Sequence, residues 1–210
     1  MRHLPTLLLV GRDSTYFAPT YLALLKEGDG NEHSKKEDSI RRKELSTAAQ
    51  DGIYKFLAEN LFGFLKADPK CAIFLKGALN CTRVSIEIIK PVMERLADIA
   101  SEKFEIGADN LVESASGHML LKKIITQDKI RASEGIPTFS QMLLNHLGTK
   151  GTLECYLKCN RGAFILVTMI ETNLPELQKS VKEVLKSHKL DLKSQKTRGA
   201  EILTEKLKTI

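Results

Sequence analysis

The sequence contains no tryptophan, no Cys-x-x-Cys pair and no long apolar run, and these absences exclude several classes of protein. Its four cysteines lack the spacing of a zinc ribbon or a thioredoxin-type site, so we expect reduced thiols and no metal or other cofactor. The longest apolar stretch, of the kind at 163–167, falls far short of the roughly 18–20 residues of a membrane span. A signal-peptide pattern is also missing, which predicts a cytosolic or nuclear protein without membrane contact.

Two groups of residues in the sequence resemble a metal site and a catalytic site. Cys155 and Cys159 lie one helical turn apart and, with His146, would supply three metal ligands; without a fourth ligand at a usual spacing, small residues on a packed helix are the preferred interpretation. Ser116 and His118 offer a nucleophile and a base, but neighbouring residues of a helix start point in different directions. Nucleotide-binding loops, GxSxG elbows and HExxH motifs are absent, so we expect no enzyme.

Length and charge place the chain among soluble globular proteins. It has 210 residues, 42% hydrophobic and 28% charged, and a net charge of +6. Residues 1–105 hold 16 basic and 15 acidic side chains, whereas residues 106–210 hold 16 and 11. A negatively charged partner should therefore meet the second half of the chain first.

A recurring segment organises the sequence. DPKCAIFLKGAL, SASGHMLLKKII, CNRGAFILVTMI and QKTRGAEILTEKL align on the small residues Cys71, Gly117, Gly162 and Gly199. The third, fourth, seventh and eighth residues after each anchor are apolar in fifteen of sixteen cases, Lys206 being the exception. This spacing predicts one face of an α-helix. Short polar residues just before these helices predict N-caps: Asp68, Ser114, Ser116, Asn160 and Thr197.

The same pattern predicts the fold class. Successive anchors are 46, 45 and 37 residues apart, each recurring helix follows another apolar-periodic stretch, and nothing resembles alternating strands. We therefore expect an all-α stack of helical repeats over 1–210, with a polar loop at 28–37 between an N-terminal helix near 16–26 and a charged helix beginning near Asp38. Pro137 should open a later helix, and Leu7, Leu8 and Leu9 should expose apolar surface.

The clearest basic feature is a lysine stripe near the C-terminus. On a helix beginning at Pro175, lysines spaced three, four and three residues apart share about a quarter of the circumference. The apolar positions of this helix centre on a face more than about 100° away. Such a stripe suits the neutralisation of phosphates, although a solvated helix face is an open alternative. Its members and their possible extension into the last repeat are Lys179, Lys182, Lys186 and Lys189, then Lys193, Lys196 and Arg198.

Two smaller groups of cations complete the candidate nucleic-acid-binding residues. The first is diluted by neighbouring acids, so a helix start with i,i+4 charge pairs competes with a binding role: Lys35, Lys36, Arg41, Arg42 and Lys43. The second lies near the recurring helices, where a solvated surface is again the alternative: Lys122, Lys123 and Arg161.

Several motifs in the same order resemble one known family. GDGNEHSKKEDSIRRKEL (28–45), ESASGHMLLKKIITQDK (113–129), NRGAFILVTMI (160–170) and RGAEILTEKL (198–207) are similar to the C-terminal part of the Puf-A family, also called Pumilio homolog 3 or penguin, with its CPL region. The resemblance implies right-handed stacked helical repeats, a Pumilio-like α-solenoid, and a monomeric RNA- and DNA-binding protein of the nucleus and nucleolus. It also implies roles in ribosome biogenesis, including pre-rRNA processing, and in translational control.

The resemblance also implies how bases would be read, and the residues depart from that pattern. In base-reading Pumilio repeats, the first, second and fifth residues after the anchor form a polar pair and a stacking side chain. The four triplets here lack that pattern: Ala72, Ile73, Lys76; His118, Met119, Lys122; Ala163, Phe164, Val167; Ala200, Glu201, Thr204. We therefore expect sequence-tolerant binding through backbone charge. The alternative is a scaffold that docks on ribosome-assembly proteins while other repeats hold nucleic acid.

Overall fold

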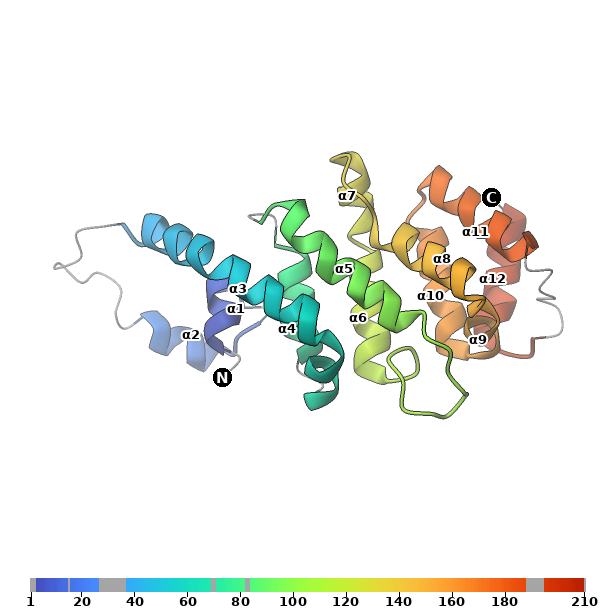
Figure 1. The fold of residues 1–210 in the computed structure, drawn as a ribbon, viewed down its shortest axis with the longest axis horizontal. Helices are drawn as coiled ribbons and strands as arrows, with labels where there is room; N and C mark the ends of the chain where they lie inside the picture. The colour runs from blue at the N-terminus through green and yellow to red at the C-terminus, as the bar shows by residue number, and fades with distance from the viewer. Residues whose placement is uncertain are drawn as a thin grey trace. The chain divides into compact units, whose positions relative to one another are not determined.

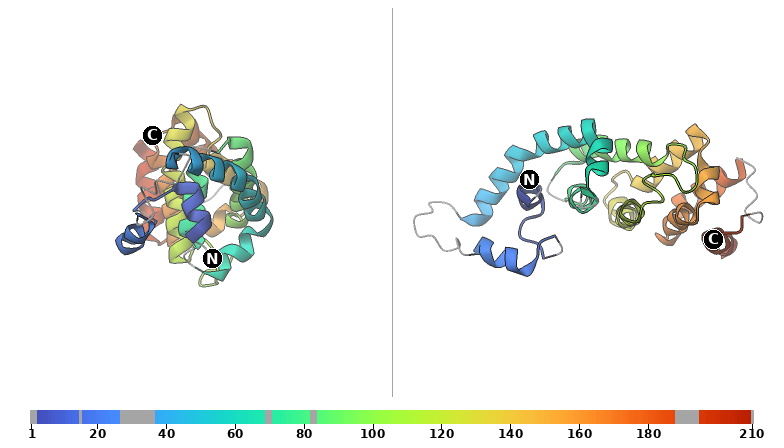
Figure 2. Two further views of the ribbon diagram at one scale, coloured as in Figure 1. Left: turned by 90° about the vertical axis from the view of Figure 1, so that its left-hand side faces the viewer. Right: turned by 90° about the horizontal axis from the view of Figure 1, so that it is seen from below.

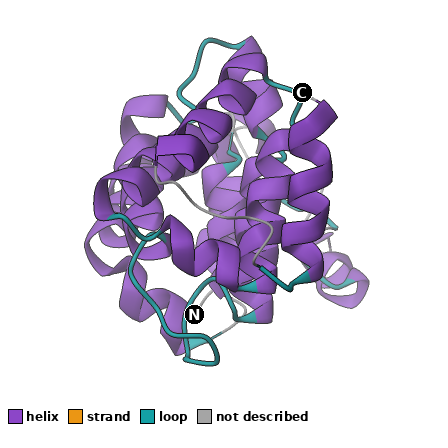
Figure 3. Ribbon diagram, turned by 90° about the vertical axis from the view of Figure 1, so that its right-hand side faces the viewer, coloured by secondary structure: helices purple, strands orange, loops and turns teal. Residues whose placement is uncertain are grey.

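The computed structural model describes residues 3–14, 16–26, 37–68, 71–81, 84–187 and 195–209. Within these ranges the chain is helical and has no strand (Figure 3), as the periodicity predicted. None of the described helices is long and apolar enough to cross a membrane. The chain divides into two compact units, residues 1–92 and 93–210, which are described separately.

The first unit is built around a long helix (Figure 1). Its helices are α1 (His3–Val10), α2 (Pro19–Lys26), α3 (Asp38–Ala67), α4 (Cys71–Leu79) and the start of α5 (Ile86–Ala100). α1 packs on both α3 and α4, so Leu9 is buried, and the prediction that this leucine is exposed is wrong. From α3, the Tyr54 hydroxyl donates a hydrogen bond of 2.6 Å to the Ala78 carbonyl of α4. Burial raises the pKa of Tyr54, which keeps this hydroxyl a donor.

The second unit surrounds one central helix, α10. Its elements are α6 (Ala115–Ile125), α7 (Asp128–Ser133), α8 (Phe139–Lys150), α9 (Leu153–Lys158), α10 (Asn160–Glu171), α11 (Pro175–Ser187) and α12 (Arg198–Thr209). α10 contacts α6, α9, α11 and α12, while α8 packs on α6 and α11. In the right-hand view of Figure 2, α6 and α12 are seen almost end-on, on either side of α10.

The four recurring helices are those that the sequence predicted, namely α4, α6, α10 and α12. In the first three, all twelve predicted core positions are buried. In α12 only Leu203 of its four positions is buried, because α12 packs on α10 and α9 while Ile202 and Leu207 stay partly exposed.

The small anchor residues permit close packing at the helix starts. A Cβ on Gly162 would lie 2.7 Å from both Cα and the carbonyl oxygen of Tyr156. A Cβ on Gly199 would lie 2.6 Å from the carbonyl oxygen of Asn160, which is where α12 begins against α10. Since backbone atoms cannot move aside cheaply, these positions require glycine for packing.

The helix caps agree with the sequence at two positions and differ at a third. Ser114 Oγ accepts from the Gly117 amide at 3.1 Å, and Thr197 Oγ1 accepts from the Ala200 amide at 3.2 Å. The prediction that Asn160 caps α10 is wrong, since Cys159 Sγ accepts from the Gly162 amide instead. Asn160 Oδ1 accepts from the Gly199 amide at 2.8 Å, so it joins two successive repeats.

A buried carboxylate holds α7 to α8. Asp128 is fully buried; its oxygens accept from the amides of Phe139 and Ser140 at 2.9 and 2.8 Å and from the Ser140 hydroxyl. Arg131 donates to the same carboxylate at 3.0 Å. Asp128 therefore satisfies free amides at the start of α8, where the predicted opening residue Pro137 stands two residues before the helix.

We predict that Gly162→Ala destabilises the chain by about 1–3 kcal/mol, because the new methyl group must displace the backbone of Tyr156. Gly148→Ala is the matched control: its Cβ would meet only Val184 at 3.9 Å, so it should be neutral or stabilise by up to about 1 kcal/mol. Urea unfolding followed by circular dichroism measures both. Equal effects of the two substitutions would contradict the close-packing account.

We also predict that Asp128→Ala costs about 3–5 kcal/mol of unfolding free energy, since it leaves the buried guanidinium of Arg131 without its carboxylate. Glu201→Ala removes a pair of the same i,i+3 spacing, to Arg198, but an exposed one, and should cost less than about 1 kcal/mol. A small effect of Asp128→Ala in the same urea titration would show that the hydrogen bonds and the ion pair of Asp128 do not stabilise the fold.

Candidate nucleic-acid interface

Ion pairs within the second unit separate its cations into two groups. A cation already held by a carboxylate is less available to a phosphate, because the pair must first be broken. The paired cations are Arg95 and Lys150 with Asp98, Arg131 with Asp128, Lys158 with Glu154, Arg198 with Glu201 and Lys206 with Glu171. Arg198, a predicted site residue, therefore belongs to the paired group.

The Lys150 pair shows how firmly such cations are engaged. Lys150 Nζ donates to Asp98 Oδ1 at 2.7 Å and to the Asp98 carbonyl at 2.8 Å. The bond to Lys150 holds the pKa of the Asp98 carboxyl below its usual range. With the Tyr156 hydroxyl donating to the Ala100 carbonyl, this lysine closes the end of α5, which is a structural role.

Three predicted site residues form what we call the α6–α10 patch: Lys122, Lys123 and Arg161. α6 contains no acidic residue, and within the described ranges none of the three cations is paired with a carboxylate. Lys122 Nζ lies 5.9 Å from the centroid of the Phe164 ring on α10. The Arg161 guanidinium donates to the carbonyl of Glu113, which orients it beside α6.

His118 shows that the charges of the α6–α10 patch converge. Burial, followed by the charges of Lys122 and Arg161, lowers the pKa of His118. Its Nδ1 is buried without a hydrogen-bond partner, so protonation of the ring would bury an unsatisfied N–H. The imidazole is therefore neutral near pH 7, and the positive field at this point comes from two helices.

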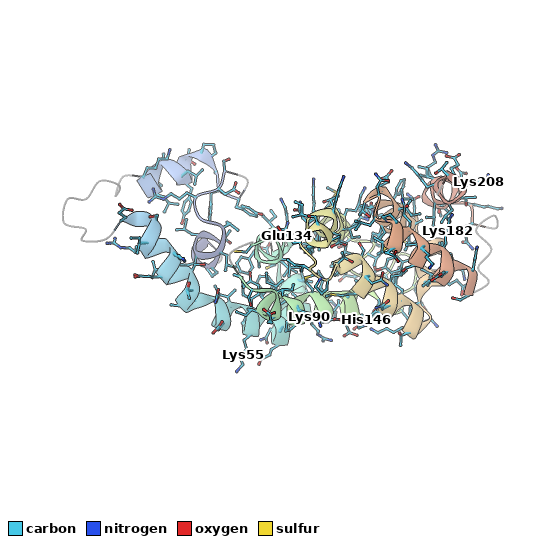
Figure 4. The ribbon with its side chains drawn as sticks, turned by 90° about the horizontal axis from the view of Figure 1, so that it is seen from above. Lys55, Lys90, Glu134, His146, Lys182 and Lys208 are labelled. Atoms are coloured by element: carbon cyan, nitrogen blue, oxygen red, sulfur yellow. The ribbon has the colours of Figure 1, made fainter. Side chains whose placement is uncertain are left out.

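Part of the predicted lysine stripe lies on α11, where exposed glutamates stand on the same helix. Lys179 and Lys186 are exposed and Lys182, labelled in Figure 4, is half-buried. Glu176 and Glu183 are exposed on the same helix. Lys189 and Lys193 lie outside the described residues, and Lys196 is exposed ahead of α12. We call Lys179 and Lys186 the α11 patch.

In the N-terminal group of cations, the two whose side chains are described lie apart. Arg41 and Lys43 are exposed near the start of α3, but two residues along a helix turn them to different sides. Lys35, Lys36 and the side chain of Arg42 lie outside the described residues.

The binding residues predicted from the sequence do not include the uncharged side chains next to the α6–α10 patch. Met119 is 51% exposed on α6, and Phe164 is half-buried on α10. The sequence located both as the second residue after an anchor. Their triplets carry no base-reading pair, so the sequence predicts no base contact from them. Lys122 Nζ nevertheless lies over the Phe164 ring, and Met119 lies one turn before Lys122 and Lys123 on α6.

The metal and catalytic alternatives gain no support. Cys159 caps α10, and His146 Nε2 lies 3.4 Å from Glu94 Oε2 instead of near a thiol. All four cysteines are free thiols, and the described residues contain no group of three side chains able to hold a metal ion. His118 Nδ1 makes no hydrogen bond, so it does not activate Ser116.

Stacked helix pairs with small anchor residues at their close contacts define a class, the helical-repeat proteins. The chain belongs to the CPL (NUC119) domain family, whose model matches residues 2–137. It is 34% identical to Pumilio homolog 3 of Danio rerio over 206 residues, covering 95% of this chain and 32% of that protein. Identity to the Homo sapiens Pumilio homolog 3 is 31% over 209 residues, covering 96% and 32%. The chain thus spans about a third of the relatives' length.

Solved structures agree with the family. A crystal structure of human Puf-A matches with a TM-score of 0.78 and 29% identity, covering 98% of this chain and 40% of that one. Human Puf-A in complex with DNA matches with a TM-score of 0.76 and 29% identity, covering 97% and 38%. These matches confirm the predicted Pumilio-like helical-repeat fold and the resemblance to Puf-A.

We predict that Lys122→Gln raises the pKa of His118, because it removes a positive charge that opposes protonation; burial should still keep this pKa below the usual histidine value. NMR titration of the imidazole carbon-bound protons measures it. Lys158→Gln, which removes a cation paired with Glu154 on α9, is the control and should leave His118 unchanged. An unaltered pKa in Lys122→Gln would show that the patch does not converge.

The same pKa has a consequence for stability. The folded chain binds the His118 proton less tightly than the unfolded chain, so His118 lowers the unfolding free energy as pH falls through the usual histidine range. We predict that His118→Gln flattens this part of the pH profile, measured by urea unfolding between about pH 7.5 and 5. An unchanged slope would contradict the lowered pKa.

Proposed function

We propose that the chain is a sequence-tolerant RNA- and DNA-binding module that holds phosphates through its basic surface, with the α6–α10 patch as the principal contact. The observation that carries the proposal is that Lys122 and Arg161 converge on His118, with Lys123 next to Lys122 on α6, and that none of the three has a carboxylate partner among the described residues. Unpaired cations release bound counterions when they neutralise phosphates, which favours association. The DNA complex of human Puf-A, a structural relative, supports this class of ligand.

Burial of the triplet residues supports binding without a base code. Ala163, Val167 and Ala200 are buried, so they reach no base. Met119 and Phe164 are accessible in part but offer no donor or acceptor pair for a base edge. Contacts are left to the charged side chains, which recognise the backbone that all sequences share.

The proposal includes a cellular setting. Similarity to Pumilio homolog 3 over most of the chain and about a third of that protein supports a module of a longer protein. We place it in the nucleolus, where it would act on pre-ribosomal RNA during ribosome biogenesis and on mRNA in translational control. In this role it acts as a monomer beside ribosome-assembly proteins and without catalysis.

A protein-docking scaffold is the second candidate, and the first unit favours it. Large apolar side chains there are exposed: Ile40, Leu45, Phe56 and Phe62 on α3, and Ile73 on α4. Exposed apolar groups suit a protein partner better than a phosphate backbone. On this reading the cations contribute solubility, and nucleic acid is held by repeats outside the chain.

Fluorescence anisotropy across a salt series tests the main proposal. Three unrelated oligonucleotides should bind with similar affinity, and Lys122→Gln/Lys123→Gln/Arg161→Gln should reduce the log–log salt slope by about 2, since each phosphate contact contributes roughly 0.7–0.9. Affinity at low salt should fall at least about tenfold.

The matched control removes the same number and kind of charges from paired positions. Lys158→Gln/Lys206→Gln/Arg198→Gln should retain most of the wild-type slope, because these cations are engaged by carboxylates. Equal losses of affinity and of salt slope in both variants would show that net charge alone explains the binding. Failure of the folded wild-type chain to bind at low salt would overturn the proposal in favour of the scaffold.

A further inference from the structure

The unpaired cations of the second unit lie on helices that bury their apolar faces in a common core. α6 and α10 contact each other, whereas α11 packs on α8 and α10. The α6–α10 patch and the α11 patch are therefore separated by packed side chains. Whether one nucleic-acid strand can reach both depends on how α10 and α11 are oriented.

α10 presents very little surface, and all of it lies on one strip. Its residues from Gly162 to Ile170 are buried except Phe164, and Arg161 is exposed one turn before that ring. The remaining sides of α10 are covered by α6, α9, α11 and α12. The α6–α10 patch thus opens to solvent on the strip that no neighbouring helix covers.

α11 presents its lysines on the side away from α10. Leu177, Val181 and Leu185 are buried where α11 packs on α8 and α10. Gln178 Nε2 donates to the Ile170 carbonyl at 3.0 Å, which fixes the rotation of α11 against the end of α10. At 100° per residue, Lys179 and Lys186 point about 150° from this buried stripe.

The spacing of the two lysines fits a phosphate backbone. Seven residues along a helix put Lys179 and Lys186 about 10 Å apart, and their long flexible side chains allow both ammonium groups to reach phosphates of the same strand. Glu176 and Glu183 lie on a neighbouring strip of α11, roughly 60–80° around the helix, and oppose such a contact. α11 is thus a weaker surface than the α6–α10 patch.

We infer that one chain holds two nucleic-acid segments at once, the first on the α6–α10 patch and the second on the α11 patch. The inference rests on the proposed function and adds bivalency to it. Two phosphate-binding faces with a packed core between them join separate segments, or distant parts of one folded RNA. Linkage of two modest sites raises the overall affinity for a long nucleic acid above that for a short one.

Stoichiometry and bridging test this inference on the full 210-residue chain. Donor- and acceptor-labelled oligonucleotides of about ten nucleotides, within the usual range of one single-strand binding site, are mixed with the chain at low salt. We expect two oligonucleotides per chain by native mass spectrometry and energy transfer between the labels. Light scattering should show that the bridging species contains one chain.

Variants assign each segment to its face. Lys179→Gln/Lys186→Gln and Lys122→Gln/Lys123→Gln/Arg161→Gln should each bind one oligonucleotide and lose energy transfer. Lys158→Gln/Lys206→Gln, which removes paired cations, should keep two. Glu176→Gln/Glu183→Gln should strengthen the second binding step several-fold; this gain of binding cannot arise from misfolding.

The outcomes separate this inference from the proposed function. Three results would overturn bivalency while leaving the binding module in place. They are a stoichiometry of one oligonucleotide per wild-type chain, energy transfer only in a species that contains two chains, and two bound oligonucleotides in Lys179→Gln/Lys186→Gln. Absence of binding by the folded wild-type chain would overturn both.

Discussion

The second unit depends on the close approach of backbone segments at the start of α10 and α12. Without a Cβ, Gly162 lies against the backbone of Tyr156, and Gly199 lies against the carbonyl of Asn160. These contacts bring α9, α10 and α12 near enough for α10 to be buried on almost every side. This one helix buries most of its own residues in the core of the unit, which stabilises the stack. The caps from Cys159 and Asn160 satisfy the amides that the close approach leaves free.

Burial of α10 also limits which of its side chains can contact a ligand. A helix with one open strip can present few side chains, and here the strip offers a guanidinium and an aromatic ring beside the lysines of α6. Ion pairs elsewhere in the unit engage the cations that flank the strip, as with Lys206 and Glu171 between α12 and α10. The interface is therefore defined as much by carboxylates that occupy other cations as by the cations left unpaired.

Comparison with the relatives shows what a repeat fold retains when base reading is absent. The chain matches human Puf-A over 98% of its length, yet its triplet positions carry alanines, a valine and a glutamate where a base-reading repeat needs hydrogen-bonding pairs. Small buried residues at these positions let the helices pack closely. Packing and base reading thus compete for the same helix faces, and at these positions of the chain the residues serve packing.

The sequence by itself determined the recurring helices and their core positions, because apolar spacing and small anchors report local periodicity. The anchors lie in the first turn of α4, α6, α10 and α12, and Leu121, Ile124 and Leu166 are buried as predicted. It did not determine which cations are available. Lys122 and Lys206 are alike as residues of two recurring segments, yet one lies beside Phe164 and the other pairs with Glu171. It also predicted the wrong hydrogen-bond partner for Asn160, since the amide from which its side chain accepts, that of Gly199, is 39 residues away. Ion pairs and caps across helices depend on distances between segments remote in sequence, and only the tertiary structure decided those.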